Sequence, residues 1–300
     1  MNKPIHLGQL QTFVSVVQHG SFSAAAQRLD ITQPAVSLQI RQLEKRLGAS
    51  LIERVGRRAL PTAAGSELLA HAEQIHAVVA SAVDAVARRS SGAMGRVRLG
   101  TGATACIFLL PRILKDLRHR FPQLEITVTT GNTADIVKAI DDNVLDIGLV
   151  TLPAAGRAFD ITPVLKDEFV VIAPRELELP ARVSAALLAT KPVLLFEPGG
   201  NTRKITDDWL AASGVALKPV MSLGSVEAIK ALVAAGLGCA ILPAMAVRGA
   251  RERAGLAVRP LSPRLQRTLA VVIRRDKRLH AGLSDLLRAL KSLADDMPAR

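Results

Sequence analysis

Apolar residues in the segment ITQPAVSLQIRQLEKRLG, residues 31–48, recur at the spacing of a helix. Counted at about 100° per residue, four apolar side chains fall within one narrow arc: Val36, Ile40, Leu43 and Leu47. This pattern predicts an amphipathic helix with that face toward a core. Four residues lie on the far side: Pro34, Leu38, Arg41 and Lys45. A solvated face and a face that lies against a partner both have this composition, so the projection alone leaves both interpretations open.

Two shorter helices are predicted before this segment. Five apolar side chains share one face of the first: Leu7, Leu10, Phe13, Val14 and Val17. Gly20 ends that helix, and Ser21 is a suitable N-cap for a second helix over residues 22–29. A two-residue connection leaves room only for a tight turn before Thr32, the expected N-cap of the third helix. Two short helices joined by a tight turn form a helix-turn-helix, whose second helix enters the DNA major groove.

In such a unit, side chains near the start of the second helix reach base edges. The polar candidates for this role are Gln33, Ser37 and Arg41. Pro34 and Leu38 are suited to packing on thymine methyl groups, and Lys45 is expected near the phosphate backbone.

A short β-hairpin is predicted directly after this helix, in the stretch LIERVGRRALPT. Three basic residues lie at its tip: Arg54, Arg57 and Arg58. A basic hairpin at this place is a wing, suited to phosphates or to the minor groove. Residues 1–65 contain eight Lys or Arg against three Asp or Glu, so the charge of the whole segment favours a polyanion.

A long helix is predicted from Thr62, a suitable N-cap, to about residue 89. Six residues form a heptad seam along it: Leu68, Ala72, Ile75, Val79, Ala82 and Val86. Its predicted length of about 40 Å is too great for burial against sixty-five residues. It either packs along its own C-terminal domain or pairs with a second copy. We favour pairing, because DNA half-sites one helical turn apart require a dimer. Residues 88–95 are interpreted as a hinge.

Short apolar strands alternate with helices from residue 96 onward, which predicts mainly parallel sheets covered by helices. The strand-like segments are 96–101, 124–130, 146–152, 169–174, 192–196, 218–223, 238–243 and 269–275. The helical ones are 107–121, 134–143, 203–213, 225–236 and about 282–295. We expect two lobes with a cleft between them. The predicted boundaries are 1–65 for the DNA-binding domain, 66–94 for the linker helix and hinge, and 95–300 for the last domain, with lobe I at 95–164 plus 268–300 and lobe II at 165–267.

Four turns between a predicted strand and the following helix carry small polar residues. Ligands of open α/β sheets bind beyond the carboxyl ends of strands, and helix N-termini favour anions. Any one such turn is weak evidence, but four at matching positions predict a single cleft. The candidate ligand-binding residues are Thr101, Gly102, Ala103, Thr104, Thr130, Gly131, Asn132, Thr133, Glu197, Gly200, Asn201, Thr202 and Ser225. Arg203 is a possible charged clamp, although an arginine in a first helical turn is more often solvated.

Composition narrows the classes of partner. The 300 residues carry a net charge of +13, which favours nucleic acid over anionic metabolites or membrane surfaces, while a basic balance also simply aids solubility. Aromatic residues make up 3%, which argues against stacking on single strands. Cys106 and Cys239 lie in apolar stretches and are expected to be buried free thiols. A second basic cluster, residues 248–278, is expected to be a solvated surface, with contact to DNA or an acidic partner as the alternative.

No catalytic constellation, metal site or cofactor motif is found, so we expect neither enzyme activity nor a metal or cofactor other than a small-molecule effector. The N-terminal segment lacks the apolar core of a signal peptide. The longest apolar run, residues 232–247, is short for a bilayer span and is interrupted by two glycines and a proline. A cytoplasmic protein with no membrane partner is expected.

The stretch FVSVVQHGSFSAAAQRLDITQPAVSLQIRQLEKRLGASLIERVGRRALPTAAG resembles the winged helix-turn-helix of bacterial LysR-type transcriptional regulators. The pieces SFSAAAQRL, TQPAVSLQIRQLE and LG-x-x-L-I-E-R are family-specific in order and spacing. By this resemblance, eight residues are DNA-proximal: Ser21, Ser23, Thr32, Gln33, Pro34, Ser37, Arg41 and Arg54. One departure is Ile52, where the family most often has Phe.

The same resemblance implies an α+β multidomain chain with an N-terminal winged helix-turn-helix, a dimerising linker helix and a C-terminal α/β effector domain like the type 2 periplasmic binding proteins. It further implies a homotetramer built as a dimer of dimers, double-stranded promoter DNA as a partner, and contact with RNA polymerase. We therefore interpret the chain as a sequence-specific DNA-binding regulator controlled by a small, anionic metabolite. Two alternatives are a solute-binding protein and a metabolic enzyme with a DNA-binding head. The first needs an export signal and no DNA-binding head, and the sequence fails both requirements. The second needs a catalytic constellation, and none is found.

Overall fold

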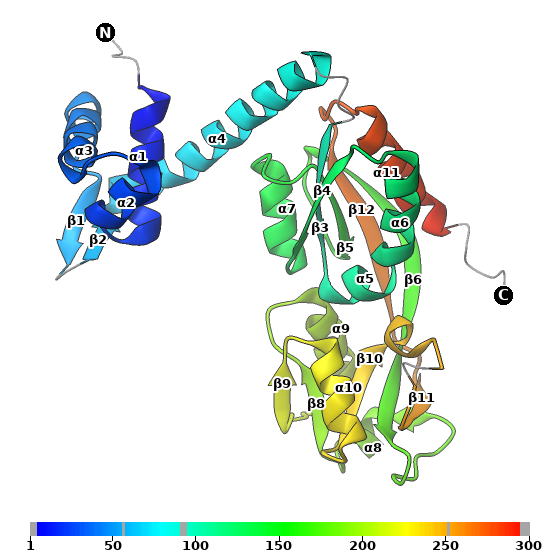
Figure 1. Ribbon diagram of the computed structural model, residues 1–300. Coiled ribbons are helices and arrows are strands. Elements are labelled where there is room, and N and C mark those ends of the chain that lie inside the picture. The colour runs from blue at the N-terminus through cyan, green and yellow to red at the C-terminus, as the bar shows by residue number, and fades with distance from the viewer. Residues whose placement is uncertain (1–4, 56–57, 91–94, 251–252, 295–300) are drawn as a thin grey trace. The chain divides into compact units, whose positions relative to one another are not determined.

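The computed structural model describes residues 5–55, 58–90, 95–250 and 253–294. The chain divides into two compact units, residues 1–83 and residues 84–300. The long helix α4 (Ala63–Ser90) contributes to both. Figure 1 labels the elements of each unit.

The first unit consists of three helices and a two-stranded antiparallel hairpin, followed by the start of α4. The helices are α1 (Leu7–His19), α2 (Phe22–Leu29) and α3 (Gln33–Leu47), and the strands are β1 (Ile52–Val55) and β2 (Arg58–Pro61). All five elements were predicted. Their shared core contains the apolar side chains Leu10, Phe13, Val16, Ala25, Val36, Ile40, Leu43 and Leu51.

Two leucines of the predicted apolar faces are exposed. Leu47 is 40% exposed, so the prediction of a core position was wrong for it, and Leu7, on the predicted apolar face of α1, is 47% exposed. Leu7 is the first residue of α1 and Leu47 the last of α3. Periodicity assigns a side chain to a helix face, but it does not indicate where the neighbouring helices end.

The turns between the helices have the expected chemistry. Gly20 and Asp30, at the ends of α1 and α2, both adopt left-handed backbone conformations, with φ of 62° and 53°. Ser21 accepts the Ala24 N–H (3.4 Å), so the predicted N-cap of α2 is confirmed. At the start of α4, a side chain on Gly65 would place its Cβ 2.0 Å from the Leu51 carbonyl oxygen, so only glycine permits this close backbone approach.

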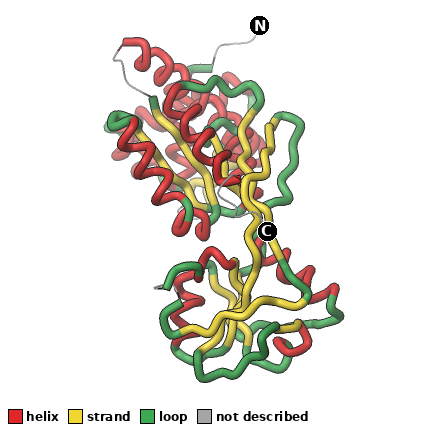
Figure 2. Tube along the Cα trace, turned by 90° about the vertical axis from the view of Figure 1, so that its right-hand side faces the viewer, coloured by secondary structure: helices red, strands yellow, loops and turns green. Residues whose placement is uncertain are grey.

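The second unit has two lobes joined by two long strands, as Figures 1 and 2 show. The sheet order is β4-β3-β5-β12-β6-β10-β8-β9, with β11 paired to β6 and β7. Lobe I contains β3 (Arg96–Thr101), β4 (Glu125–Thr130), β5 (Ile147–Thr151) and most of β12 (Gln266–Arg274). Lobe II contains β7 (Val183–Ser184), β8 (Val193–Phe196), β9 (Met221–Leu223), β10 (Cys239–Pro243) and β11 (Leu256–Ser262).

The strand β6 (Phe159–Pro174) passes from lobe I to lobe II and pairs antiparallel with β12 in one lobe and β10 in the other. The register of β6 against β12 shifts at Leu269 and Ala270, where Val164 is the extra residue. The prediction of mainly parallel sheets is therefore wrong for the centre of the unit, where antiparallel strands connect two parallel edges. A strand buried on both faces shows the same apolar run in either direction, so the sequence pattern does not reveal strand polarity.

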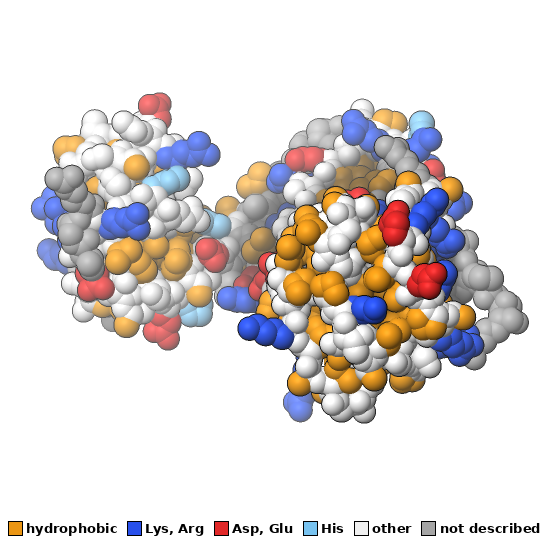
Figure 3. Space-filling model, turned by 90° about the horizontal axis from the view of Figure 1, so that it is seen from below, with side chains coloured by type: hydrophobic (Ala, Val, Ile, Leu, Met, Phe, Trp, Pro, Cys, Tyr) orange, Lys and Arg blue, Asp and Glu red, His pale blue; other side chains and the backbone are white. Residues whose placement is uncertain are grey.

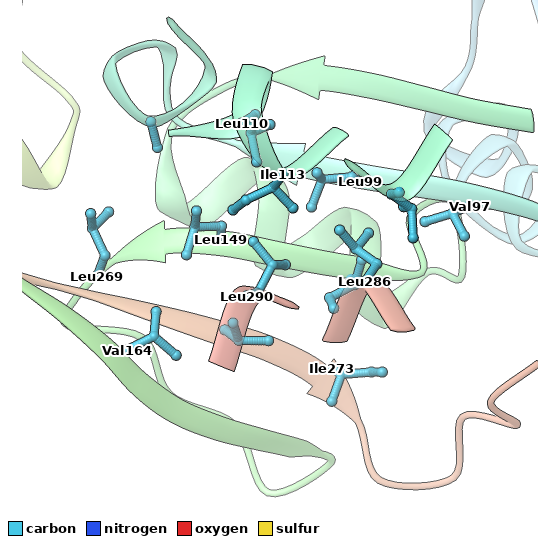
Figure 4. Packing of buried hydrophobic residues seen from close by; sticks show 14 of the residues in the cluster. Val97, Leu99, Leu110, Ile113, Leu149, Val164, Leu269, Ile273, Leu286 and Leu290 are labelled. Atoms are coloured by element: carbon cyan, nitrogen blue, oxygen red, sulfur yellow. The ribbon is translucent and has the colours of Figure 1, made fainter. Parts of the chain in front are cut away.

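Helices cover both faces of each lobe. In lobe I these are α5 (Ala103–Phe108), α6 (Leu110–Arg120), α7 (Thr133–Asp141) and α11 (Ala281–Lys291), followed by η2 (Ser292–Ala294). In lobe II they are α8 (Ala185–Leu188), α9 (Asn201–Ala212), α10 (Val226–Ala234) and η1 (Ala244–Val247). Figure 4 shows the core of lobe I, where Leu99 and Leu149 from the sheet meet Ile113 of α6 and Leu286 of α11.

The helix predicted over residues 107–121 is two helices. Pro111 lies in the first turn of α6 and has no N–H to continue the bonding of α5. Leu109 lies between the two helices. The prediction also missed β7, α8, β11 and η1, which are short or amphipathic without clear periodicity.

Candidate functional site

The outer face of α3 presents the predicted base-contacting residues. Thr32 caps the helix, its Oγ1 accepting the Ala35 N–H at 3.4 Å. Gln33 donates from Nε2 to Ser37 Oγ (2.9 Å), and Arg41 donates from Nε to the Ser37 carbonyl oxygen (3.3 Å). The three polar candidates therefore form one continuous row along the helix.

The remaining predicted positions on α3 are also at the surface. Leu38 is 53% exposed although it is apolar, and Pro34 and Lys45 are exposed as well. A leucine exposed to this degree beside Arg41 is consistent with a surface that packs against an apolar group such as a thymine methyl. The opposite side of α3 is held to α1 by two polar bonds that the sequence did not reveal, Thr12 to Gln39 (2.5 Å) and Gln9 to Gln42 (3.0 Å).

The hairpin is fastened to the helices at two places. Glu44 of α3 accepts the backbone N–H of Leu51 (2.8 Å), and the Ala59 N–H of β2 donates to the Gly20 carbonyl oxygen (2.9 Å). The first bond holds the start of the hairpin to α3, and the second holds β2 to the turn before α2. The wing is therefore oriented by a carboxylate and a turn, which its own sequence does not specify.

A hollow of about 340 Å³ lies where the wing meets the start of α2. Five predicted DNA-proximal residues line it: Ser21, Ser23, Gln33, Arg54 and Arg58. The Arg54 guanidinium lies over the Phe22 ring, 5.6 Å from its centroid, which orients its charge. The predicted contact residue Arg57 lies outside the described residues.

The predicted seam of α4 is partly wrong. Ala72 is fully buried in the core of the first unit, and Leu68 packs against that core. Farther along, Ile75, Val79 and Ala82 of the predicted seam are exposed, together with two valines that the heptad did not include, Val78 at 57% and Val83 at 61%. The side chain of Val86 lies outside the described part. The unpartnered apolar stripe thus begins at Ile75, about two turns later than predicted.

A cavity of about 440 Å³ opens between the lobes of the second unit. All but two of the predicted ligand-binding residues line it: Gly102, Ala103, Thr104, Thr130, Gly131, Asn132, Thr133, Glu197, Gly200, Asn201 and Thr202. Residues 100 positions apart in the chain thus form a single cavity, as the four matching turns predicted. Their role toward a ligand stays a prediction.

Two predicted residues are not among those lining the cavity. The Thr101 side chain is fully buried and donates to the Leu149 carbonyl oxygen (2.9 Å), so it joins β3 to β5. Ser225 accepts the Ala228 N–H (3.3 Å) and caps α10. Both are small hydroxyl residues at strand–helix turns, and sequence alone does not distinguish a structural hydroxyl from one that faces a ligand.

The helices that begin at the cavity differ in their caps. Asn132 caps α7 by accepting the Asp135 N–H (3.0 Å). In contrast, α5 and α9 begin after glycines, Gly102 and Gly200, and neither N-cap forms a side-chain bond. The first-turn N–H groups of α9 therefore have no capping side chain, and helix N-termini of this kind bind anions.

Asn201 and Lys230 of lobe II both contact lobe I. Asn201, the first residue of α9, donates from Nδ2 to the carbonyl oxygens of Thr151 (2.7 Å) and Pro153 (2.9 Å) in lobe I. Apart from the residues that line the cavity, Lys230 Nζ of α10 lies 5.3 Å from the centre of the Phe108 ring of α5.

Sequence analysis missed the most buried charges of the cavity. Arg267 of β12 lines the cavity and is 3% exposed, and it pairs with Asp167 of β6, which is fully buried (Nη2 to Oδ2, 3.1 Å). Burial raises the pKa of the Asp167 carboxyl, although the positive charge of Arg267 opposes the shift. Burial likewise lowers the pKa of Arg267, against the effect of Asp167. No motif links the two, because 100 residues separate them and only strand pairing brings them together.

The other cavity arginine, Arg203, is not solvated as its helix position suggested. Its Nη1 donates to the Phe196 carbonyl oxygen (2.5 Å) and its Nε to Asp207 (2.8 Å). Both bonds stay within lobe II, so the guanidinium braces the loop after β8 against α9.

The two cysteines differ. Cys239 is fully buried in β10, and burial raises the pKa of its thiol to about 11. Cys106 is only half-buried, so the prediction of a buried thiol was wrong for this residue.

The second basic cluster does not form one patch among the described residues. Arg274 pairs with Asp276 (2.7 Å), Lys277 with Asp146 (2.6 Å), and Arg264 with Glu168 (3.4 Å). On the face of the second unit shown in Figure 3, lysine and arginine side chains are scattered among hydrophobic and neutral ones.

Within the described ranges, no group of three or more His, Cys, Asp or Glu side chains is arranged to hold a metal ion. Over the same ranges, no helix combines the length and the apolar character needed to cross a bilayer.

A winged helix-turn-helix unit followed by a two-lobed α/β unit with an interlobe cavity defines the class, a DNA-binding regulator with a ligand-binding domain. Models of known protein families agree with this class. Residues 7–66 match the bacterial regulatory helix-turn-helix of the lysR family, and residues 90–295 match the LysR substrate binding domain. The chain belongs to the LysR family of DNA-binding transcriptional regulators.

Curated relatives and solved structures support this membership. The transcriptional regulator CbbR of Rhodospirillum rubrum is 34% identical over 241 residues, 80% of each chain. The regulator YeiE of Escherichia coli K12, which is described as uncharacterized, is 34% identical over 289 residues, 94% of this chain and 96% of that protein. The crystal structure of CbnR, a LysR family transcriptional regulator, covers 97% of this chain and 100% of its own with a TM-score of 0.75 and 21% identity. At that identity it shows the fold alone, and CbnR has also been solved in complex with its target DNA.

Proposed function

We propose that this regulator reads promoter DNA with the outer face of α3 and the hollow beside the wing, and that a small anion bound between the lobes controls it. The observation that carries the proposal is the cavity of about 440 Å³, bounded by two helix starts without side-chain caps and by a buried arginine. A cavity of this size suits a metabolite.

The charge of the effector follows from the donors that the cavity offers. First-turn N–H groups, threonine hydroxyls and the Arg267 guanidinium are all suited to carboxylate or phosphate oxygens. The acidic side chains at the cavity, Asp135 and Glu197, are exposed and remain hydrated. An anion is therefore favoured over a cation. No other cofactor and no catalytic step are part of the proposal, and the proposed location is the cytoplasm.

A second copy of the chain is the proposed partner of the apolar stripe on α4. Ile75, Val78, Val79 and Val83 recur at helical spacing and are between 36% and 61% exposed. Pairing of two such stripes buries these side chains and places two α3 helices on one operator. We expect Val78→Lys to lower the self-association constant in sedimentation, with Glu73→Lys as a control on an exposed residue of the same helix.

The proposed mechanism is a shift between two arrangements of the lobes. Effector binding favours one arrangement because it contacts both lobes, and the change alters the spacing of paired recognition helices. A dimer of dimers and a contact with RNA polymerase complete the proposal by analogy with the family.

DNA-binding titrations of the full chain, with and without a panel of small acids and phosphorylated metabolites, test this function. We expect one or more anions to change operator affinity and to raise the melting temperature. If only neutral or cationic compounds have these effects, the anionic class is wrong. A product formed from any of them in a turnover assay contradicts the non-catalytic assignment.

A further inference from the structure

The cavity contains a buried positive charge that already has a counter-ion within the protein. Arg267 donates from Nε to Asp167 Oδ2 (3.2 Å) and from Nη1 to Thr202 Oγ1 (3.1 Å). Its guanidinium therefore has one edge on a buried carboxylate and another edge in the cavity. Thr202 belongs to the first turn of α9, whose N-terminus has no side-chain cap.

Asp167 is held on more than one side. Its Oδ1 accepts the Met245 N–H at 3.1 Å and lies 3.7 Å from Nη2 of Arg248, which is largely exposed. With Arg267 on Oδ2, the carboxylate is bound to β12, to η1 and to the residue after it. These elements meet where β6 passes between the lobes.

The charges of Arg267 and Asp167 together determine how strongly an anion is attracted to this part of the cavity. A buried guanidinium attracts an anion strongly, because water screens the interaction little. The carboxylate of Asp167 offsets that attraction from the far side. An effector therefore meets a guanidinium whose positive charge is partly neutralised from within the protein.

We propose that Asp167 is a built-in counter-ion that weakens anion binding at Arg267 and so sets how much effector is needed for a response. Asp167 acts through Arg267 and does not touch the effector, so it is a positioning residue. The N-terminus of α9, the Thr202 hydroxyl and Arg267 Nη1 together receive the negative group. This inference rests on the proposed anionic effector and adds what limits the affinity of the protein for it.

Replacement of Asp167 is expected to lower stability and to raise anion affinity, and this combination distinguishes a counter-ion from a purely structural ion pair. Asp167→Asn leaves the guanidinium without its counter-ion, so the protein without ligand is less stable but binds anions more tightly. The double variant Arg267→Gln/Asp167→Asn removes both members of this buried pair, so no unpaired charge is left at this place, and it has no anion response. A structural pair predicts lower stability for Asp167→Asn with no gain in anion binding.

Glu168→Gln is the matched control. Glu168 is the next residue on β6, it is about half exposed, and it pairs with the exposed Arg264 (3.4 Å), so the same charge is removed beside the same strand. Its variant reports any general effect of net charge on anion binding.

The experiment is a thermal-shift titration of the full-length chain with sulfate, inorganic phosphate and succinate, each against chloride at equal ionic strength. We expect Asp167→Asn to melt below the wild type without anion, and to half-saturate at a concentration about tenfold lower. The Glu168→Gln protein behaves as the wild type, and the double variant does not respond. If Asp167→Asn does not fold, Asp167→Ser, which also removes the carboxylate but keeps a hydroxyl acceptor, is measured in its place with the same expected shift.

Each of three outcomes contradicts a different part of the proposal. Equal half-saturation for Asp167→Asn and the wild type overturns the counter-ion role. A full response in the double variant places the anion elsewhere and overturns the inference, while the proposed effector control stands. Absence of stabilisation by all three anions, in the wild type as well as in the variants, overturns both.

Discussion

The proposed DNA-binding surface and the cavity between the lobes are built in opposite ways. The first is assembled from one continuous stretch, from Gly20 to Pro61, in which helix caps and a hairpin place each side chain near its neighbours in sequence. The cavity is assembled from turns between Gly102 and Leu269, which only strand pairing brings together. A local site is specified by motif and spacing, while a site assembled by topology depends on the register of a whole sheet.

The largest change in stability is expected for a core substitution, which tests whether the two units unfold independently. Leu43 is fully buried in the core of the first unit, so Leu43→Ala is expected to cost that unit about 2–5 kcal/mol in its free energy of unfolding. Hydrogen exchange should show lost protection in α1–α3 and unchanged protection in β3–β12. Equal loss in both units contradicts the separation. Leu286→Ala in lobe I is the reciprocal change.

Arg41→Ala tests the local site directly. Loss of this exposed side chain from α3 should weaken specific operator binding by about 1–3 kcal/mol, roughly 5- to 150-fold, because one base contact is removed. Footprinting and anion-dependent thermal shift are the measurements, and the thermal shift should be unchanged. Lys115→Ala, an exposed residue of α6, loses the same charge in the second unit. Equal weakening by both variants attributes the effect to net charge.

The pH dependence of the second unit depends on Asp146. Burial raises the pKa of this carboxyl, but bonds from Arg98 (2.9 Å) and Lys277 (2.6 Å) outweigh it, so the pKa is below its ordinary value of 3.8. The ionised form is favoured in the folded state. Its stabilisation is therefore complete above about pH 4 and is lost as the pH falls further. Urea unfolding of Asp146→Asn should show lower stability near neutral pH and a weaker decline in acid. An unchanged acid profile contradicts this.

The smallest change in stability is expected at the effector cavity. Gly200 has φ of −98° and ψ of 151°, and open space surrounds the position of a Cβ, so Gly200→Asp fits without strain. The new carboxylate should cap α9 and stabilise the unit by roughly 0.3 kcal/mol. It should also abolish the anion response by occupying the same N–H groups. Gly200→Ala, which adds a methyl group and no acceptor, should retain the response. Loss of the response in both variants indicates steric exclusion and not charge.

Prediction from sequence was most successful where the signal is local. The caps Ser21 and Thr32, the wing and the limits of α3 follow from residue types at fixed spacing. The four strand–helix turns were also found, because each turn is a local motif. Their convergence on one cavity was inferred from a general rule for α/β sheets, which does not distinguish Thr104, which lines the cavity, from Thr101, which is buried in the sheet.

The predictions that failed concern features that depend on contacts between segments far apart in the chain. Leu68 and Ala72 satisfy a heptad, yet they belong to the core of the first unit, because that core extends farther along α4 than periodicity indicates. Strand polarity around β6 and β12 was missed because apolar runs look alike in both directions. The pair of Asp167 and Arg267 has no sequence signature at all.

By itself the sequence determined the order of helices and strands, the helix-turn-helix with its wing, and the family to which the chain belongs. These features depend on periodicity, caps and glycine turns, whose interactions reach only a few residues along the chain. Only the tertiary structure decided which hydroxyls line the cavity, which part of α4 remains uncovered, and which carboxylate neutralises the buried Arg267. Those outcomes depend on burial and on pairing between strands 100 residues apart, and neither is encoded at any single position.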